Sequence, residues 1–221
     1  MPTEKWQTAF GASVPKDTDS FTITAPPKTD IWRPADDDDV FNAPMIYQRI
    51  KASDFKKIEA TMWAPWKTQY DQGGLVIAFL NSSTPKTPAD PNEEVAAFKN
   101  LKWIKAGIEF FGTESCLGIV GTDRYSDWSL SPMNKEYHQK AKFRAERDGT
   151  TLWIYAAQEG DEKLKPMREV KWAFLEGRGE GDILVGVYAA KPTPEEGNEK
   201  DGATQKGIEV TFSELVLVKD E

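Results

Sequence analysis

The chain has 221 residues, a length that all-β sandwiches commonly reach as one domain. Its net charge of −8, from 36 acidic and 28 basic residues, argues against nucleic acid and anionic membranes as partners. The single cysteine, Cys116, excludes an internal disulfide, and no apolar run approaches the roughly 20 residues of a membrane-spanning helix. Because the start of the chain is polar, we expect no signal peptide and a cytoplasmic location.

Short apolar or alternating segments, separated by Gly, Pro, Asn and Asp, indicate an all-β fold. In chain order the expected strands are 21–24, 46–51, 55–63, 74–80, 103–111, 116–122, 138–147, 151–157, 171–174, 183–190 and 208–218. The strand at 74–80 is apolar throughout, which predicts a central strand covered on both faces. Hairpin turns are expected at 52–54, 112–115 and 148–149.

Three polar segments rich in Pro, Gly and charge are expected to be surface loops. They are 33–44, which holds four consecutive aspartates, 81–100, which is a long insertion with a short helix at 92–100, and 191–207. Since each lies between strands, we expect a single domain over 1–221 with its core at about 20–218.

Alternation along each strand assigns its side chains to two faces. The set Ile104, Ala106, Ile108 and Phe110 is predicted to face the core, as are the sets Ile58, Ala60, Met62 and Ala141, Phe143, Ala145. The opposite faces carry aromatic and charged side chains, which could form a ligand groove. The candidate ligand-binding residues are Tyr47, Arg49, Glu59, Trp63, Trp103, Lys105, Glu109, Asp127 and Arg144. The alternative is that the charged ones are cross-strand pairs on a wet surface.

The block 103–109 (Trp-Ile-Lys-Ala-Gly-Ile-Glu) and the segment 126–129 (Ser-Asp-Trp-Ser) carry a resemblance. With 29–32, 70–75, 185–190 and 210–212, they resemble a largely uncharacterised family with a concanavalin-A-like fold, which includes the yeast regulation-of-enolase protein. The resemblance implies a jelly-roll sandwich of two antiparallel sheets, one with a concave outer face. It also implies a possible role in regulating a glycolytic enzyme. Shorter members pass almost directly from the 74–80 strand to the 103–111 strand, so the insertion at 81–100 is a departure.

Glycoside hydrolases on this fold use two carboxylates on the concave face. Glu109 has Gly107 and Lys105, not a second acid, at the offsets that share its face. A pair from two strands, such as Glu109 with Glu59, stays open, as does a salt bridge from Lys105 to Glu109 across Gly107. Bare backbone at Gly107 could also let a ligand approach closely. For Asp127 we favour a brace within its own turn over catalysis.

Other chemistry finds little support in the sequence. Cys116 lies in an apolar strand and is predicted to be core, His138 is the only histidine, and the aspartate run 36–39 lacks the spacing of a calcium loop. We therefore expect no metal and no cofactor. The primary hypothesis is a non-catalytic binding or regulatory protein for a carbohydrate, a small metabolite or a protein partner. The alternatives are a carbohydrate-active enzyme and acidic loops that dock on a basic protein.

Overall fold

The computed structural model describes residues 5–80, 96–136, 139–175, 181–195 and 206–220, and most of them lie in β-strands. Seven strands form one antiparallel sheet. In spatial order they are β1 (Gln7–Ala9), β5 (Met45–Lys51), β14 (Asp182–Ala190), β7 (Gln72–Phe79), β8 (Lys102–Phe111), β9 (Glu114–Thr122) and β10 (Ser126–Pro132). The strand expected to be central, β7, does lie in the middle of this sheet.

A second antiparallel sheet of six strands packs against the first. Its order is β13 (Lys165–Val170), β12 (Thr151–Gln158), β11 (Lys140–Asp148), β6 (Phe55–Trp63), β15 (Ile208–Lys219) and β2 (Ser20–Ala25). The fold is thus the concanavalin-A-like β-sandwich that the sequence predicted. A third, two-stranded sheet of β3 (Ile31–Ala35) and β4 (Asp38–Phe41) completes it.

The main core lies between the two large sheets, and the predicted inward faces fill it. Ile104, Ala106 and Ile108 of β8 meet Ile58, Ala60 and Met62 of β6 and Ala141, Phe143 and Ala145 of β11 in one buried cluster. Phe110 packs against the same cluster while partly buried. Alternation therefore assigned these faces correctly, because only one side of each strand can reach the opposing sheet.

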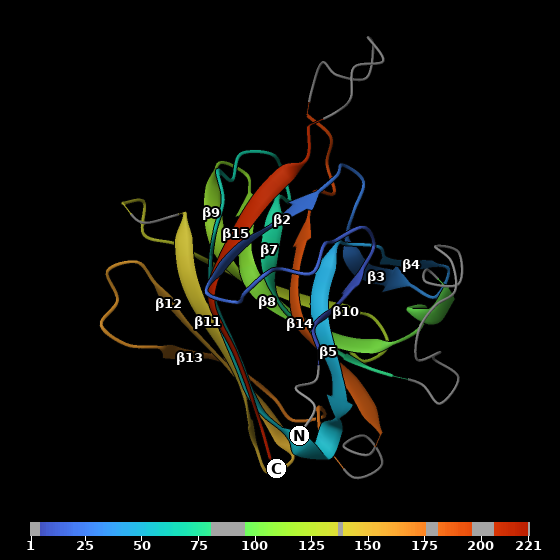
Figure 1. Ribbon diagram of the computed structural model, residues 1–221. Coiled ribbons are helices and arrows are strands. Elements are labelled where there is room, and N and C mark those ends of the chain that lie inside the picture. Colours follow the sequence, from blue (N-terminus) through green and yellow to red (C-terminus); the bar gives the residue numbers. More distant parts are fainter. Residues whose placement is uncertain (1–4, 81–95, 137–138, 176–180, 196–205, 221) are drawn as a thin grey trace.

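A second apolar cluster covers part of the outer face of the seven-stranded sheet. Ile31 and Phe41 of the β3–β4 hairpin pack there against Tyr47, Val76 and Trp103. Figure 1 shows this hairpin on the side of the seven-stranded sheet that is turned away from β11, β12 and β13. The outer face is therefore partly closed over, and what stays open lies beside the hairpin.

Several local expectations are wrong, for reasons of tertiary pairing. Residues 52–54 form a 3-10 turn, η1 (Ala52–Asp54), and not a hairpin, because β5 and β6 belong to different sheets. Residues 171–174 form a turn, and the strand there is the preceding β13. The expected hairpins at 112–115 and 148–149 do join β8 to β9 and β11 to β12.

Five strands were not expected: β1, β3, β4, β10 and β13. β1, β10 and β13 are sheet edges, where one side of the strand has no pairing partner among the described residues and apolar alternation is weak. The predicted loop 33–44 contains β4, with two of the four aspartates in the strand. Of the insertion, 81–95 lies outside the described residues. The described end of the short helix expected at 92–100 is helical at 96–97 and a turn at 98–100, with Phe98 buried. His138 and residues 196–205 also lie outside the described residues. Within the described part of the chain, no helix is long and apolar enough to cross a membrane.

Candidate functional site

A pocket of about 350 Å³ opens on the outer face of the seven-stranded sheet, beside the β3–β4 hairpin. We call it the Glu109 pocket. It is lined by Asp30, Trp32, Tyr70, Gln72, Lys105, Glu109, Val120, Trp128, Pro192 and Thr193. Its side chains come from β3, β7, β8, β9 and β10 and from the segments before β3, before β7 and after β14. This volume lies within the range of small-molecule sites in proteins.

Glu109 lies in β8 on the face opposite the core, directly across from Gln72 of β7. Its side chain is buried, and Trp128 donates its indole N–H to Glu109 Oε2 over 3.2 Å. Burial raises the pKa of Glu109 to about 7, the nearby Lys105 charge and the Trp128 bond act to lower it, and the Asp30 charge acts to raise it. A carboxyl group with such a pKa is partly protonated near neutral pH and can give or take a proton there.

Gln72 is held in one orientation by four hydrogen bonds. Its Oε1 accepts from Lys105 Nζ at 2.7 Å and from the Tyr188 hydroxyl at 3.0 Å. Its Nε2 donates to Asp30 Oδ1 at 3.2 Å and to the Tyr70 carbonyl at 3.3 Å. Burial raises the pKa of Tyr188 well above its ordinary value, so this hydroxyl stays a neutral donor.

Lys105 is a buried cation whose charge is compensated within the site. Its Nζ lies 3.3 Å from Asp30 Oδ1 and 5.8 Å from the ring centres of both Trp103 and Tyr188. The bridge from Lys105 to Glu109, which the sequence left open as an alternative, does not form, because Gln72 and Asp30 bind the ammonium group instead. Lys105 and Glu109 do share the outer face of β8, as alternation predicted, but they bind different side chains.

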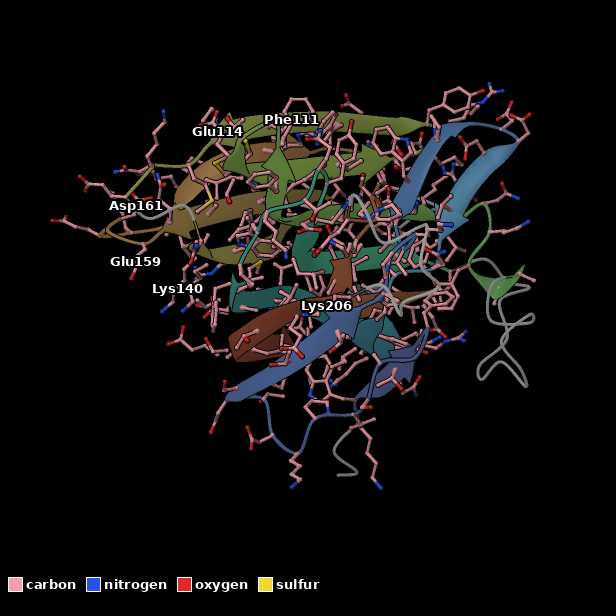
Figure 2. All side chains as sticks on the ribbon, turned by 90° about the horizontal axis from the view of Figure 1, so that it is seen from above. Phe111, Glu114, Lys140, Glu159, Asp161 and Lys206 are labelled. Atoms are coloured by element: carbon pink, nitrogen blue, oxygen red, sulfur yellow. The ribbon has the colours of Figure 1, made fainter. Side chains whose placement is uncertain are left out.

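An aromatic wall borders the pocket. Trp128 packs edge-on against Trp32, Tyr70 and Phe111, with ring centres 6.2, 6.4 and 5.4 Å apart. Tyr70 has a φ of +67°, a backbone conformation that is rare for a bulky residue and often retained for function. Figure 2 shows Phe111 beside Glu114 at the tip of the β8–β9 hairpin, on the rim of this wall.

Two glycines shape the floor of the outer face. A Cβ on Gly118 of β9 would lie 3.3 Å from Glu109 Oε2, so the absence of a side chain makes room for the carboxyl group. At Gly107 a Cβ would lie 2.0 Å from the Gly73 carbonyl oxygen. The missing side chain at Gly107 therefore allows the close approach of strand β7. It does not provide space for a ligand, which the sequence had suggested as one possibility.

Of the nine candidate residues, only Lys105 and Glu109 line the Glu109 pocket. Tyr47, Arg49 and Trp103 lie on the same outer face but away from it. Tyr47 and Trp103 are buried in the second apolar cluster, and Arg49 pairs with Asp182 at 2.8 Å. Trp103 is fully buried and in edge contact with Phe41, so its ring is not exposed to a ligand.

Glu59, Trp63 and Arg144 lie on the outer face of the other sheet. Arg144 and Glu59 are direct cross-strand neighbours with Nε and Oε2 2.7 Å apart, as expected of a wet surface pair. A shallower hollow of about 530 Å³ there is lined by Lys142, Arg144 and Glu214 among others. Figure 2 shows Lys140, Glu159 and Asp161, which also line it, far from Phe111. A catalytic pair of Glu109 with Glu59 is excluded, because the core separates them.

Asp127 is the second residue of β10, paired with Gly121 of β9, and does not brace a turn. Its side chain is 89% exposed, and its Oδ2 lies 3.9 Å from Arg168 of β13. It sits opposite Gly121, so it points to the side facing the six-stranded sheet and not into the Glu109 pocket.

The remaining chemistry is sparse. Cys116 is buried as expected, and burial raises the pKa of its thiol, which disfavours a reactive thiolate. Among the described residues, no three His, Cys, Asp or Glu side chains gather closely enough to hold a metal ion.

Reasoning from strand faces missed most of the pocket, including Asp30, Trp32, Tyr70, Gln72 and Trp128. All five lie outside the strands that were expected, so their faces could not be assigned. A signal was nevertheless present. Four of the six segments that carry the family resemblance, 29–32, 70–75, 103–109 and 126–129, supply seven of the described lining residues.

Comparison with known proteins identifies an uncharacterised family, and the resemblance to the regulation-of-enolase protein stays a prediction. Residues 8–219 match the family described as "Protein of unknown function (DUF1349)". The chain belongs to this family. The uncharacterized protein AN7484 of Emericella nidulans is a relative, 36% identical over 193 residues that cover 87% of this chain and 88% of that protein.

Two solved structures share the fold over nearly the whole chain. A functionally unknown protein from Saccharomyces cerevisiae has a TM-score of 0.69 at 20% identity, covering 98% of this chain and 97% of its own. The exolytic alginate lyase AlyA5 from Zobellia galactanivorans has a TM-score of 0.58 at 12% identity, covering 99% and 96%. At such identities the likeness shows the fold alone.

Proposed function

We propose that this protein binds a saccharide in the Glu109 pocket. The observation that carries the proposal is the aromatic wall of Trp32, Tyr70 and Trp128 facing a group of fixed polar side chains in one pocket. Sugar rings present apolar C–H faces that pack on aromatic rings, and hydroxyl groups that need donors and acceptors at set positions. Asp30 offers acceptors and Glu109, in its protonated form, a donor as well, and hydrogen bonds already hold both side chains in place.

The charges in the pocket favour an uncharged sugar. The Asp30 and Lys105 charges compensate each other, and the raised pKa of Glu109 leaves that group partly neutral near pH 7. A uronate would bring its carboxylate close to two acidic side chains, without an unpaired cation among the described lining residues. Neutral pentose or hexose units avoid this repulsion.

The fold neighbours are consistent with this class of ligand. The alginate lyase of Zobellia galactanivorans is by its name a carbohydrate-active enzyme on the same sandwich, although its polymer is acidic. Because one fold serves many functions, this likeness supports a saccharide only as a class, and the lining residues carry the choice.

The test is a thermal-shift and calorimetric screen against neutral mono- and oligosaccharides, with uronate oligomers as the charged counterpart. A ligand at 100 times its Kd stabilises the fold by about 2.7 kcal/mol. Trp32→Ala should weaken binding about tenfold or more, the usual effect of losing an aromatic contact. Trp153→Ala, which removes a half-buried ring of β12, is the matched control and should bind normally.

Two results would reject the proposal. One is a screen in which no saccharide binds. The other is a loss of binding on Trp63→Ala together with normal binding by Trp32→Ala, which would move the site to the outer face of the six-stranded sheet.

A cytoplasmic location, a single domain and a role in regulating a glycolytic enzyme are further proposals, supported by composition and resemblance alone. A saccharide-sensing regulator would need a protein partner in addition to the pocket. Capture of glycolytic enzymes on the immobilised protein, with and without the bound sugar, tests this role, and equal recovery on a blank resin would count against it.

A further inference from the structure

The Glu109 pocket contains two carboxyl groups beside the same amide side chain. Glu109 is the direct cross-strand partner of Gln72, and such partners have Cβ atoms about 5 Å apart. Gln72 in turn donates to Asp30 Oδ1 at 3.2 Å. The Asp30 charge also acts on the pKa of Glu109, so the two groups interact across the pocket.

The surroundings of the two carboxyl groups differ in a way that suits different roles. Asp30 Oδ1 is within hydrogen-bonding distance of three donors, the Ile31 backbone N–H, Gln72 Nε2 and Lys105 Nζ, and its side chain is 24% exposed. Glu109 is buried, and the described residues offer it a single hydrogen bond, from Trp128. A stabilised carboxylate next to a buried carboxyl group is the arrangement that separates a base from a proton donor.

From this geometry we propose that the pocket hydrolyses a glycosidic bond of the uncharged saccharide, with Glu109 as proton donor and Asp30 as base. This inference rests on the proposed function and adds a reaction to it. The sequence favoured a non-catalytic protein because Glu109 had no second acid on its own strand. The second acid instead comes from the segment before β3, which folding brings to the same pocket.

The reaction balances with water as the second substrate. Glu109 gives its proton to the glycosidic oxygen, and the bond from that oxygen to the anomeric carbon breaks with its electron pair left on the oxygen. Water forms the new bond to the anomeric carbon while one of its protons passes to Asp30. Exchange with solvent then returns a proton to Glu109 and removes one from Asp30, so one glycoside and one water give a hemiacetal sugar and an alcohol.

Hydrolysis fits the pocket better than elimination from a uronate. Elimination requires a cation or several donors to neutralise the sugar carboxylate. Lys105, the cation among the described lining residues, is already paired with Asp30 and Gln72. Gln72 is the cross-strand partner of Glu109 and donates a hydrogen bond to Asp30, so it lies beside both carboxyl groups. Two carboxyl groups that are kept apart in this way suit attack by water, which must fit between the base and the sugar.

The experiment compares leaving groups. Wild type and Glu109→Gln are assayed on neutral oligosaccharides and on the corresponding dinitrophenyl glycosides, whose leaving group needs no proton. Glu109→Gln should lower turnover of the oligosaccharides by roughly 10²–10⁴-fold and that of the dinitrophenyl glycosides far less. The amide can still accept the Trp128 N–H, so the fold should be retained, and a melting curve checks this.

A second variant tests the base. Asp30→Asn should lower turnover of both substrate classes, and added azide, which needs no base, should restore it and give the glycosyl azide. Glu146→Gln on the outer face of the six-stranded sheet is the control and should leave turnover unchanged.

The outcomes separate this inference from the proposed function. A saccharide that binds and is never hydrolysed by the wild type overturns the reaction and leaves binding intact. Equal loss by Glu109→Gln on both substrate classes, or full activity of Asp30→Asn without azide, overturns the assigned roles. If no saccharide binds, both proposals fail together.

Discussion

The indole N–H of Trp128 on the edge strand β10 donates a hydrogen bond to Glu109 of β8, two strands away. The same indole is packed against Trp32, Tyr70 and Phe111. One residue therefore joins the aromatic wall to the buried carboxyl group. The orientation of the Glu109 carboxyl group depends on the position of the aromatic wall. We therefore expect a substitution in the wall to alter the carboxyl group, and a substitution of Glu109 to alter the wall.

Replacing Trp128 tests this coupling. Trp128→Phe keeps an aromatic ring but removes the donor to Glu109, a bond worth about 0.5–1.5 kcal/mol. We expect saccharide affinity to fall by up to about tenfold, because the carboxyl group loses its fixed orientation. Calorimetric titration of the sugar found in the screen measures the effect. Affinity equal to that of the wild type would show that the Trp128 bond does not orient a binding group.

Glu109 should make stability depend on pH between its ordinary pKa of 4.5 and its raised pKa of about 7. In this window the folded chain holds the Glu109 proton and the unfolded chain releases it, so rising pH favours unfolding. The stability that this group contributes is complete below pH 4.5 and is lost by about pH 7. Relative to Glu109→Gln, the wild type should lose up to about 3 kcal/mol across the window.

Urea unfolding of both chains at several pH values between 4.5 and 8 provides the measurement. Other titrating groups are common to both chains and cancel in the difference. If the free energy of unfolding changes with pH by the same amount in wild type and Glu109→Gln, then Glu109 has an ordinary pKa and is not desolvated in the folded state.

A buried ion pair anchors the segment that follows β14. Lys191 Nζ lies 2.9 Å from Asp71 Oδ1, and both side chains are 1% exposed. Asp71→Asn should lower the free energy of unfolding by about 3–5 kcal/mol, because the buried Lys191 would lose its close partner and keep only the Glu195 carboxylate at 3.8 Å. The exposed pair of Lys56 with Asp220 is the control, and Lys56→Met should change stability by less than about 1 kcal/mol.

Chemical denaturation measures both variants. The adjacent Pro192 and Thr193 line the Glu109 pocket, so Asp71→Asn should also weaken saccharide binding under conditions where it stays folded. A loss below 1 kcal/mol on Asp71→Asn would show that water reaches the pair in solution.

Trp103 and Trp63 were both predicted to be ligand-binding residues, but their replacement by alanine should change the free energy of unfolding by different amounts. Trp103 is fully buried under the β3–β4 hairpin, whereas Trp63 on the other sheet is 45% exposed. Trp103→Ala should cost about 3–5 kcal/mol and Trp63→Ala less than about 1 kcal/mol. Thermal and urea unfolding measure both. Similar small losses would indicate that the hairpin does not cover Trp103 in solution.

Alternation of side chains was enough to predict most of the strands of the sandwich and the inward faces of β6, β8 and β11. It succeeded there because these strands are central and bury one full face against the other sheet. It failed at β10 and β13, which are edges, and at 171–174, where a buried Phe174 belongs to a turn. A local pattern of apolar residues indicates that a segment is buried. Because a turn can be buried as well as a strand, such a pattern does not distinguish the two.

For the candidate site, the pattern correctly turned Lys105 and Glu109 away from the core. It could not tell that Glu59 and Arg144 face away from the same core on the opposite side of the molecule, because both sheets have an outer face with the same polar alternation. The segments that carry the family resemblance include more of the pocket-lining residues than the predicted strand faces do, because these segments extend into loops and edge strands.

The sequence by itself therefore determined the all-β class, the inward faces of the central strands and the outward position of Glu109, because each depends on local periodicity. The tertiary structure alone decided that Asp30, Gln72, Glu109 and Trp128 meet, and that Trp103 is covered. These residues are far apart along the chain, and the pairing of β7 with β8 and of β9 with β10 brings them together. Strand pairing over such distances depends on the packing of the whole sandwich and leaves no local signal at the residues that it joins.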